Sequence, residues 1–401
     1  MQPILNELNA KARAEGVTYT KKRFVYEDIK KYLPERTFIA LIGSRGAGKT
    51  TILKQLLYET ESSFYVSLET GGIDTNLFEL AKELEEKDTK LLFIDEIHNY
   101  PNFEVELKRI YDFLKINVVC TSSSSISLHE LSADLSRRMR IIKVHPFSFR
   151  EFIYFEKDEI LPKFNIEDLA DMEIAKKYYG KILHLEPLFE LYLKGRNYPF
   201  TMGKIETISL FFNILETIIR NDLVLGGRVT SEEAVEVRKM ISFLGKSSVE
   251  DTSYTNVAKN IGSTKYKVEK YATVLEKTFV LRCIFPKGTN VLKEPKILLA
   301  LPYRLLYKNY DECIGAIRED FFAEAIQNLD FEINYLKSER GEKIPDYLIG
   351  ETVFEIGGVN KSASQFKGFK AKKQIILTHP GVIEEMKRPL FMVGLVEKDK
   401  K

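Results

Sequence analysis

The feature that most constrains the fold of this chain is a glycine-rich loop at residues 43–50. Gly43 and Gly48 enclose four residues, and Lys49 and Thr50 follow directly. An apolar run rich in strand-forming residues precedes the loop at 37–42, and apolar residues recur at helical spacing after it, at 51–58. This order of strand, loop and helix directs backbone N–H groups and a helix N-terminus at a phosphate. The sequence therefore predicts a phosphate-binding loop.

The loop supplies a contiguous set of nucleotide-binding candidates. We expect the Lys49 side chain to reach the β- and γ-phosphates and the Thr50 hydroxyl to ligate Mg²⁺. The glycines allow the backbone to wrap closely around a phosphate. The predicted binding residues are Gly43, Ser44, Arg45, Gly46, Ala47, Gly48, Lys49, Thr50 and Thr51.

Two carboxylates follow a second apolar run. Residues 91–94 are all apolar, which indicates a buried parallel strand, and Asp95 and Glu96 come at its C-terminal end. Open α/β sheets bind their ligands at this end of the strands. We expect Asp95 to hold Mg²⁺ and Glu96 to orient and polarise the attacking water.

Hydroxyls and arginines follow the later strands. The apolar run at 116–120 ends in Thr121 and a series of serines, of which Ser123 is the candidate to contact the γ-phosphate or the water. The alternative is a serine-rich loop that caps the next helix. Basic residues at 137–140 lead into another strand, and Arg138 is a candidate arginine finger, acting in cis or from a neighbouring subunit. The alternative is a surface arginine on an edge strand.

Four short motifs occur in order along the chain. They are the loop at 43–50, Ile-Asp-Glu-Ile-His at 94–98, Thr-Ser-Ser-Ser at 121–124 and His-Pro-Phe-Ser-Phe-Arg-Glu-Phe at 145–152. Together they resemble the prokaryotic AAA-type ATPase family that carries a C-terminal domain of unknown function, and the stretch around 146–152 is the specific marker. The family's arginine falls on Arg138, while Arg137 and Ser122 stand where the family has glycine.

The resemblance implies both a domain plan and a ligand. It implies an AAA-type P-loop ATPase domain at 1–150, a helical lid at 151–230, a winged helix-turn-helix at 231–308 and a degenerate restriction-endonuclease-like domain at 309–401. It also implies ATP, bound with Mg²⁺, as the nucleotide.

Residues 231–308 have the pattern of a helix-turn-helix. Gly262 separates two apolar-periodic stretches, and the second stretch carries Lys265, Lys267 and Lys270 away from its apolar stripe. Residues 279–299, with a turn at 287–290, are expected to form the wing. The segment is either a duplex-DNA-binding module, with Asn256, Asn260 and Arg282 as candidate base readers, or a scaffold for protein contact.

The C-terminal residues contain part of a metal-dependent nuclease pattern. Glu324, Asp346 and Glu355 match the expected carboxylates, but Gly357 stands where such a site has lysine, and Lys361 is the candidate to reach in from the following turn. The alternatives are an active nuclease and a degenerate structural or binding domain.

Composition limits the remaining function classes. The chain has 401 residues, is 44% hydrophobic and has a net charge of only +2, so any nucleic-acid surface must be a local patch. Its three cysteines show no paired spacing, which argues against a disulfide framework or a zinc site. No start typical of a signal peptide is present, and no apolar run approaches the roughly 20 residues of a membrane helix. We therefore expect a cytoplasmic protein that does not enter a membrane.

The sequence as a whole predicts a multidomain α/β protein. Its expected activity is Mg²⁺-dependent ATP hydrolysis that drives a conformational switch, with ATP-gated binding of DNA or of a protein partner. The alternatives are a nuclease regulated by the ATPase and a protein-partner switch that binds no DNA. A homo-oligomer is compatible with all three.

Overall fold

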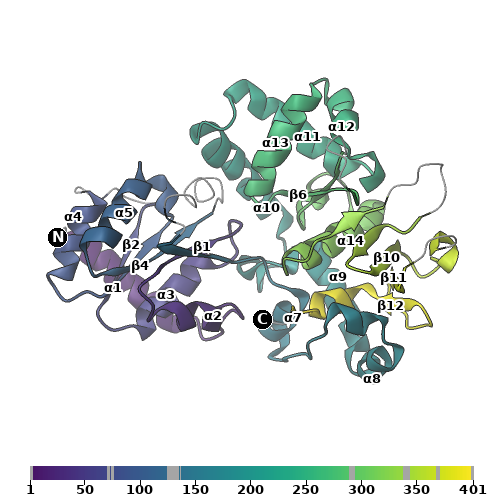
Figure 1. Ribbon diagram of the computed structural model, residues 1–401, viewed down its shortest axis with the longest axis horizontal. Helices are drawn as coiled ribbons and strands as arrows, with labels where there is room; N and C mark the ends of the chain where they lie inside the picture. The colour runs from purple at the N-terminus through teal and green to yellow at the C-terminus, as the bar shows by residue number, and fades with distance from the viewer. Residues whose placement is uncertain are drawn as a thin grey trace. The chain divides into compact units, whose positions relative to one another are not determined.

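The computed structural model describes residues 3–69, 73, 76–123, 135, 137–288, 294–336, 344–366 and 371–398. The chain divides into two compact units, Met1–Pro146 and Phe147–Lys401 (Figure 1). Each unit has its own hydrophobic core.

A five-stranded sheet forms the centre of the first unit. All of its neighbouring strands run parallel, in the order β2-β3-β4-β1-β5. The strands are β1 (Phe38–Ile42), β2 (Ser63–Ser67), β3 (Leu91–Asp95), β4 (Asn117–Ser122) and β5 (Met139–Lys143). The apolar runs at 37–42, 91–94 and 116–120 predicted β1, β3 and β4 to within about two residues, because strands covered on both faces are continuously apolar.

Helices cover both faces of this sheet. Ile39 and Leu41 belong to the core beneath α1 (Pro3–Thr18), α2 (Tyr26–Tyr32) and α3 (Lys49–Glu59). The alternate residues of β1, Phe38, Ala40 and Ile42, belong to the core beneath α4 (Leu77–Glu85) and α5 (Phe103–Phe113). A single turn, η1 (Ile97–Asn99), follows β3.

The second unit begins with helices, as the pattern at 152–225 predicted. They are α7 (Phe149–Lys157), η2 (Ile166–Ala170), α8 (Met172–Ile182), η3 (Leu183–Leu185), α9 (Glu186–Leu191), η4 (Tyr192–Arg196), η5 (Pro199–Thr201), α10 (Ile208–Thr217) and η6 (Ile218–Leu225). Gly195, with a φ of 103°, interrupts η4. Phe149 packs against Phe189, Tyr192 and Phe391, so the marker stretch contributes to the core of this unit.

Three helices and a strand pair come next. They are α11 (Ser231–Lys246), α12 (Tyr254–Ile261), α13 (Lys265–Lys277), and the antiparallel strands β6 (Leu281–Ile284) and β7 (Lys296–Leu299), with η7 (Val249–Asp251) after α11 and η8 (Tyr303–Leu306) after β7. Gly262 has a φ of 70° between α12 and α13, and Thr264 caps α13 by accepting from the Lys267 N–H. This order is compatible with the predicted winged helix, which remains a prediction, and part of its predicted turn, 289–290, lies outside the described residues.

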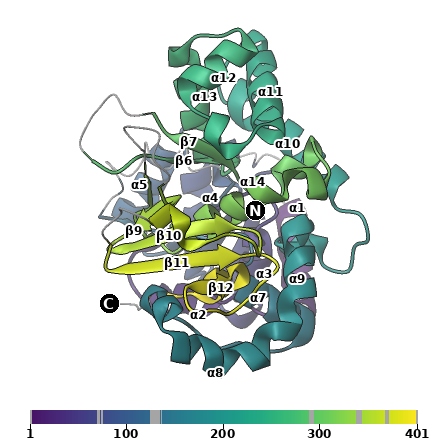
Figure 2. The same cartoon turned by 90° about the vertical axis from the view of Figure 1, so that its right-hand side faces the viewer.

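The C-terminal part is a second five-stranded sheet with a long helix. The helix is α14 (Tyr310–Gln327), and the strands are β8 (Asn334–Tyr335), β9 (Tyr347–Ile349), β10 (Thr352–Gly357), β11 (Lys373–Thr378) and β12 (Lys387–Pro389), in the order β12-β11-β10-β9-β8 (Figure 2). The turns η9 (Ala363–Phe366) and η10 (Leu390–Leu395) complete it. One hydrophobic cluster runs from Phe147 to Val396, so the helices and this sheet share a core.

Within the described residues, none of the helices combines the length and the apolar character that crossing a membrane requires.

Candidate functional site

The glycine-rich loop lies between β1 and α3. Gly46 and Gly48 have φ values of 83° and 93°, a region in which glycine is favoured. Gly43 is required for a different reason, because a Cβ atom there would lie 2.0 Å from the Val144 carbonyl oxygen. The chain thus holds the loop tightly against the end of β5.

Two basic side chains hold this loop in shape. The Lys49 Nζ donates to the carbonyl oxygens of Gly43, at 2.8 Å, and Ser44, at 3.1 Å. The buried Arg23 guanidinium donates to the Ala47 carbonyl and, at 2.8 Å, to the His145 carbonyl. Within the described part of the chain, the buried Ser44 hydroxyl has no hydrogen-bond partner, so the loop contains a polar group that could bind a phosphate oxygen.

The Asp95 carboxylate accepts three side-chain hydroxyls at the end of β3. The Thr50 and Thr121 hydroxyls donate to Oδ1 at 3.1 and 2.6 Å, and the Tyr65 hydroxyl donates to Oδ2 at 3.0 Å. Burial raises the pKa of Asp95, and these hydrogen bonds oppose the rise. A hydroxyl and a carboxylate oxygen are the hard ligands that Mg²⁺ prefers, so Thr50 and Asp95 fit this ion.

Glu96 adopts the left-handed backbone conformation, with a φ of 55°, that few non-glycine residues occupy. Its N–H donates to the Thr121 hydroxyl at 2.8 Å, and its Oε2 lies 3.3 Å from both the Ser123 N–H and the His98 Nδ1. Burial acts to raise the pKa of Glu96, but the charges of Lys49, His98 and Arg45 outweigh it and lower the pKa from its ordinary value. Glu96 is therefore an ionised carboxylate at neutral pH, and strained backbone of this kind is concentrated at functional sites.

The structure brings most of the predicted site residues together. The strand ends of β1, β3 and β4 carry Lys49, Thr50, Asp95, Glu96 and Ser123 to one edge of the parallel sheet. Among the described residues, which do not include 124–134, the buried Ser123 hydroxyl has no hydrogen-bond partner.

Arg138 lies elsewhere. Its carbonyl accepts the Phe38 N–H at the amino end of β1, whereas the loop follows the carboxyl end. The five-residue strand separates the two ends by about 13 Å or more. The Arg138 side chain also pairs with Asp112 at 3.0 Å. This position contradicts an arginine finger acting in cis, and it leaves two predictions open, a finger that acts on a neighbouring copy and a surface arginine on an edge strand.

Sequence reasoning missed three residues of this site. Arg23, just before α2, and Tyr65, in β2, contact the site from segments that are distant in the sequence. Only the folded structure shows these contacts. His98 stands two residues after Glu96, and that spacing was the one available signal.

The predicted C-terminal carboxylates are only partly brought together. Glu324 was wrongly chosen on α14, because its carboxylate accepts the Leu301 N–H at 3.0 Å and faces Arg282 at 3.6 Å. Glu319, on the same helix, lies near Asp346 instead, and its carboxylate accepts the Tyr347 hydroxyl at 2.7 Å. Burial raises the pKa of Glu319 to about 7, and the nearby Asp346 charge adds to the rise.

The Lys361 side chain reaches the Glu355 carboxylate from the turn after β10, as the sequence predicted. It forms an ion pair with Glu355, and a Cβ at Gly357 would lie 2.4 Å from the Lys361 Cγ. The lysine stem therefore occupies the space beside position 357. Across the ranges described, no group of three or more His, Cys, Asp or Glu side chains is arranged to hold a metal ion.

The predicted DNA-contacting side chains are engaged within the protein. Lys265 pairs with Glu294 at 2.8 Å, Lys267 with Glu236 at 2.7 Å, and Lys270 with Glu233 at 2.9 Å. The predicted base readers are engaged in the same way: Asn260 donates to Asn256, and Arg282 donates to Asn328. The positive charge that the sequence assigned to this surface is therefore largely compensated.

Comparison with known proteins agrees with the loop geometry. Residues 35–153 match the profile of a family described as an AAA domain. This match supports an AAA-type P-loop ATPase in this part of the chain.

Individual proteins are also similar to this chain. An uncharacterized protein of Methanocaldococcus jannaschii is 28% identical over 404 residues, covering 89% of this chain and 85% of that protein. A second uncharacterized protein of the same organism is 28% identical over 160 residues, covering 38% of this chain and 36% of that protein. A solved Walker-type ATPase of Pyrococcus abyssi superposes with a TM-score of 0.41 at 14% identity, over 71% of this chain and 94% of its own.

The raised pKa of Glu319 predicts how stability depends on pH. The folded chain binds this proton more tightly than the unfolded chain, so stability falls as pH rises from the ordinary pKa of 4.5 toward about 7. Glu319→Gln removes this loss while keeping an acceptor for Tyr347. We expect the difference in melting temperature, Glu319→Gln minus wild type, to become more positive as the pH is raised from about 5 to about 8. Glu61→Gln, at an exposed position, is the control, and a difference for Glu319→Gln that stays constant with pH would contradict the assignment.

Proposed function

We propose that the first unit binds ATP with Mg²⁺ and hydrolyses it, and that this turnover drives a conformational switch. The observation that carries the proposal is the convergence of Lys49, Thr50, Asp95 and Glu96 at one edge of a parallel sheet. The AAA-domain match favours ATP as the nucleotide. Phosphoryl transfer depends mainly on positioning and electrostatics, so a small set of residues is sufficient.

Each residue has a distinct role in this proposal. The Lys49 ammonium, which donates to loop carbonyls, would donate to phosphate oxygens instead. Thr50 and Asp95 would hold Mg²⁺, which neutralises charge on the phosphate oxygens. The ionised Glu96 would accept a hydrogen bond from the attacking water and orient it, and Ser123 would support that arrangement.

A neighbouring copy of the chain completes the proposal. Arg138 lies at the opposite edge of the sheet, so it would reach a nucleotide only in a homo-oligomer. A cytoplasmic location is also part of the proposal.

Replacing Glu96 tests the chemistry. Glu96→Gln keeps the size of the side chain and removes its charge, so we expect ATP binding to persist and turnover to fall by about 100-fold or more, as on loss of a key polar catalytic group. Steady-state phosphate release, with nucleotide binding measured separately, checks this. Glu61→Gln is the matched control, and unchanged turnover in Glu96→Gln would refute the role of Glu96.

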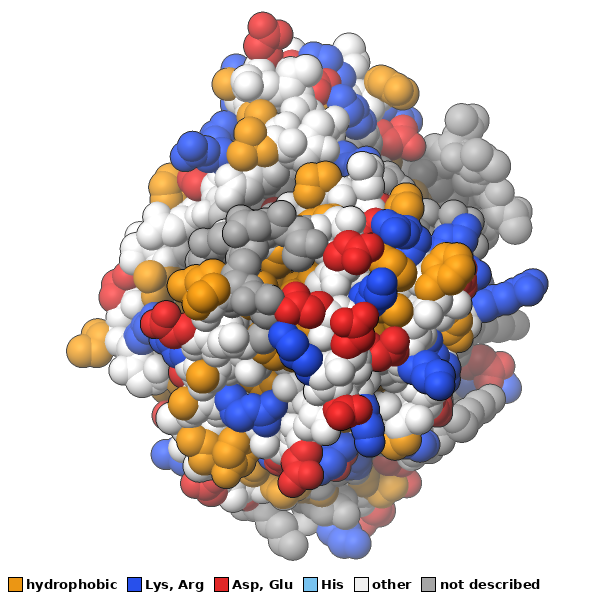
Figure 3. All heavy atoms as spheres, turned by 90° about the vertical axis from the view of Figure 1, so that its left-hand side faces the viewer, with side chains coloured by type: hydrophobic (Ala, Val, Ile, Leu, Met, Phe, Trp, Pro, Cys, Tyr) orange, Lys and Arg blue, Asp and Glu red, His pale blue; other side chains and the backbone are white. Residues whose placement is uncertain are grey.

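The structure-based observations favour a protein partner over DNA as the output of the switch. Lys265, Lys267 and Lys270 already pair with carboxylates, so their contact with phosphates would have to break three ion pairs. On the face in Figure 3, basic and acidic side chains are interspersed over the described residues rather than gathered by sign. ATP-gated DNA binding is the second candidate, because the order of α11 to β7 is compatible with a winged helix. A nuclease receives less support, since the described carboxylates do not form a metal centre.

Turnover in the presence of duplex DNA separates these outputs. We expect ATP turnover to be the same with and without duplex DNA at low salt, because the lysines of α13 are compensated. Stimulation that disappears when Lys265, Lys267 and Lys270 are changed together to Gln would instead establish the DNA-binding alternative. Lys239→Gln, at an exposed position of α11, controls for the loss of charge alone.

A further inference from the structure

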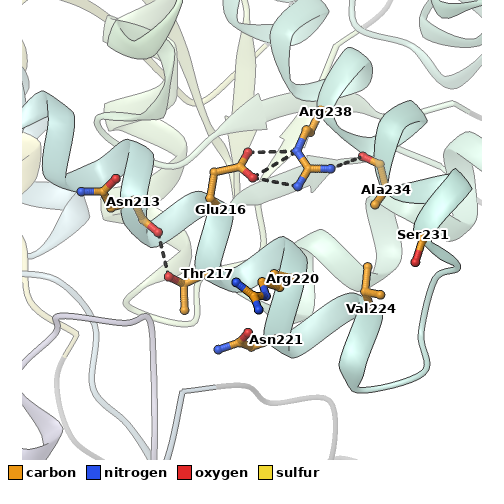
Figure 4. A pocket seen from close by; sticks show the side chains of 9 residues that line it. All are labelled: Asn213, Glu216, Thr217, Arg220, Asn221, Val224, Ser231, Ala234 and Arg238. Carbon is orange, nitrogen blue, oxygen red and sulfur yellow. Dashed lines mark hydrogen bonds and ion pairs between the residues drawn. The ribbon is translucent and has the colours of Figure 1, made fainter.

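A polar groove of about 580 Å³ lies in the second unit, between the continuous helix α10–η6 and the start of α11 (Figure 4). Its lining includes Asn213, Thr217, Arg220 and Asn221 on one side and Ser231 and Arg238 on the other. The volume falls within the range of small-molecule sites, which is about 300–1,000 Å³.

The lining residues form one face of each helix. Residues 213, 217, 220, 221 and 224 recur at spacings of three and four, and so do 231, 234 and 238. Where two helices pack, such facing stripes are normally apolar. Here both stripes are mainly polar, the residues at 213, 220, 221, 231 and 238 are exposed, and space remains between the two helices.

The backbone of the α10–η6 side of the groove is unusual as well. The segment η6 is π-helical over eight residues, Ile218–Leu225, and carries Arg220 and Asn221. π-Helical geometry is rare and is frequently found at functional sites.

The groove is lined by two arginines and one glutamate, so it has one more positive charge than negative charges. Arg238 donates to both oxygens of Glu216, with its Nη2 at 2.7 Å from Oε2 and its Nε at 3.0 Å from Oε1. Arg220 has no ion pair or hydrogen bond from its side chain within the described residues. The side-chain amides of Asn213 and Asn221 have no hydrogen-bond partners in this part of the chain either, and Figure 4 shows Arg220 between Thr217 and Asn221. A guanidinium flanked by side-chain amides is suited to an oxyanion.

We propose that this groove is a binding site for a small anion that carries a phosphate or a carboxylate group, with Arg220 as its charge partner. The side-chain amides of Asn213 and Asn221 supply further hydrogen bonds to the polar body of the ligand. Glu216 limits the affinity, because its carboxylate repels the same charge and occupies Arg238. The site is separate from the phosphate loop and does not depend on ATP hydrolysis.

Binding of three probes to the full chain tests the site. The full chain carries Lys49→Ala so that the phosphate loop contributes little to binding. The probes are inorganic phosphate, AMP and succinate, and calorimetry measures the Kd of each. We expect at least one probe to bind and Arg220→Gln to raise its Kd by about tenfold or more, the effect of losing a hydrogen bond to a charged group. Lys239→Gln, on α11 outside the groove, should leave the Kd unchanged, and Glu216→Gln should lower it.

The probes distinguish the sources of the anion. Binding of AMP or phosphate without succinate assigns a phosphorylated ligand, and the reverse assigns a carboxylic acid. Equal binding of all three assigns general recognition of oxyanions. Absence of binding by every probe, or equal effects of Arg220→Gln and Lys239→Gln, would overturn the proposal, whatever the ATPase assay shows.

Discussion

The first unit depends on the hydrogen bonds that the buried Asp95 carboxylate accepts. It accepts hydroxyls from Thr50 at the start of α3, Tyr65 in β2 and Thr121 in β4. A buried carboxylate is costly unless hydrogen bonds satisfy it. These three bonds form only if β2 and β4 flank β3 in parallel register, with Ser67 beside Asp95 and Cys120 beside Ile94. The order of the sheet and the candidate metal-binding carboxylate therefore depend on each other.

Contiguous features of this site could be predicted from the sequence. The loop at 43–50 follows β1 directly, and Asp95 and Glu96 end an apolar run, so local patterns placed all of them. Strands β1, β3 and β4 were predictable for the same reason, since both of their faces are buried.

Contacts between distant segments could not be predicted in this way. The choice of Glu324 over Glu319 failed because α14 buries or partly buries both, and its apolar pattern does not show which face meets β10. The pairing of Lys267 and Lys270 with α11 depends on how α11 packs against α13. The same limit applies to Arg23, which joins the loop from a polar lead-in segment without a recognisable motif.

The dependence of ATP affinity on Mg²⁺ tests the central claim most directly. Calorimetry would compare wild type with Asp95→Asn, which keeps the shape of the side chain, in Mg²⁺ and in EDTA. The account predicts that wild type binds ATP more tightly with Mg²⁺ and that Asp95→Asn binds ATP but loses most of this gain. An equal gain in the variant, or none in wild type, would contradict the role of Asp95.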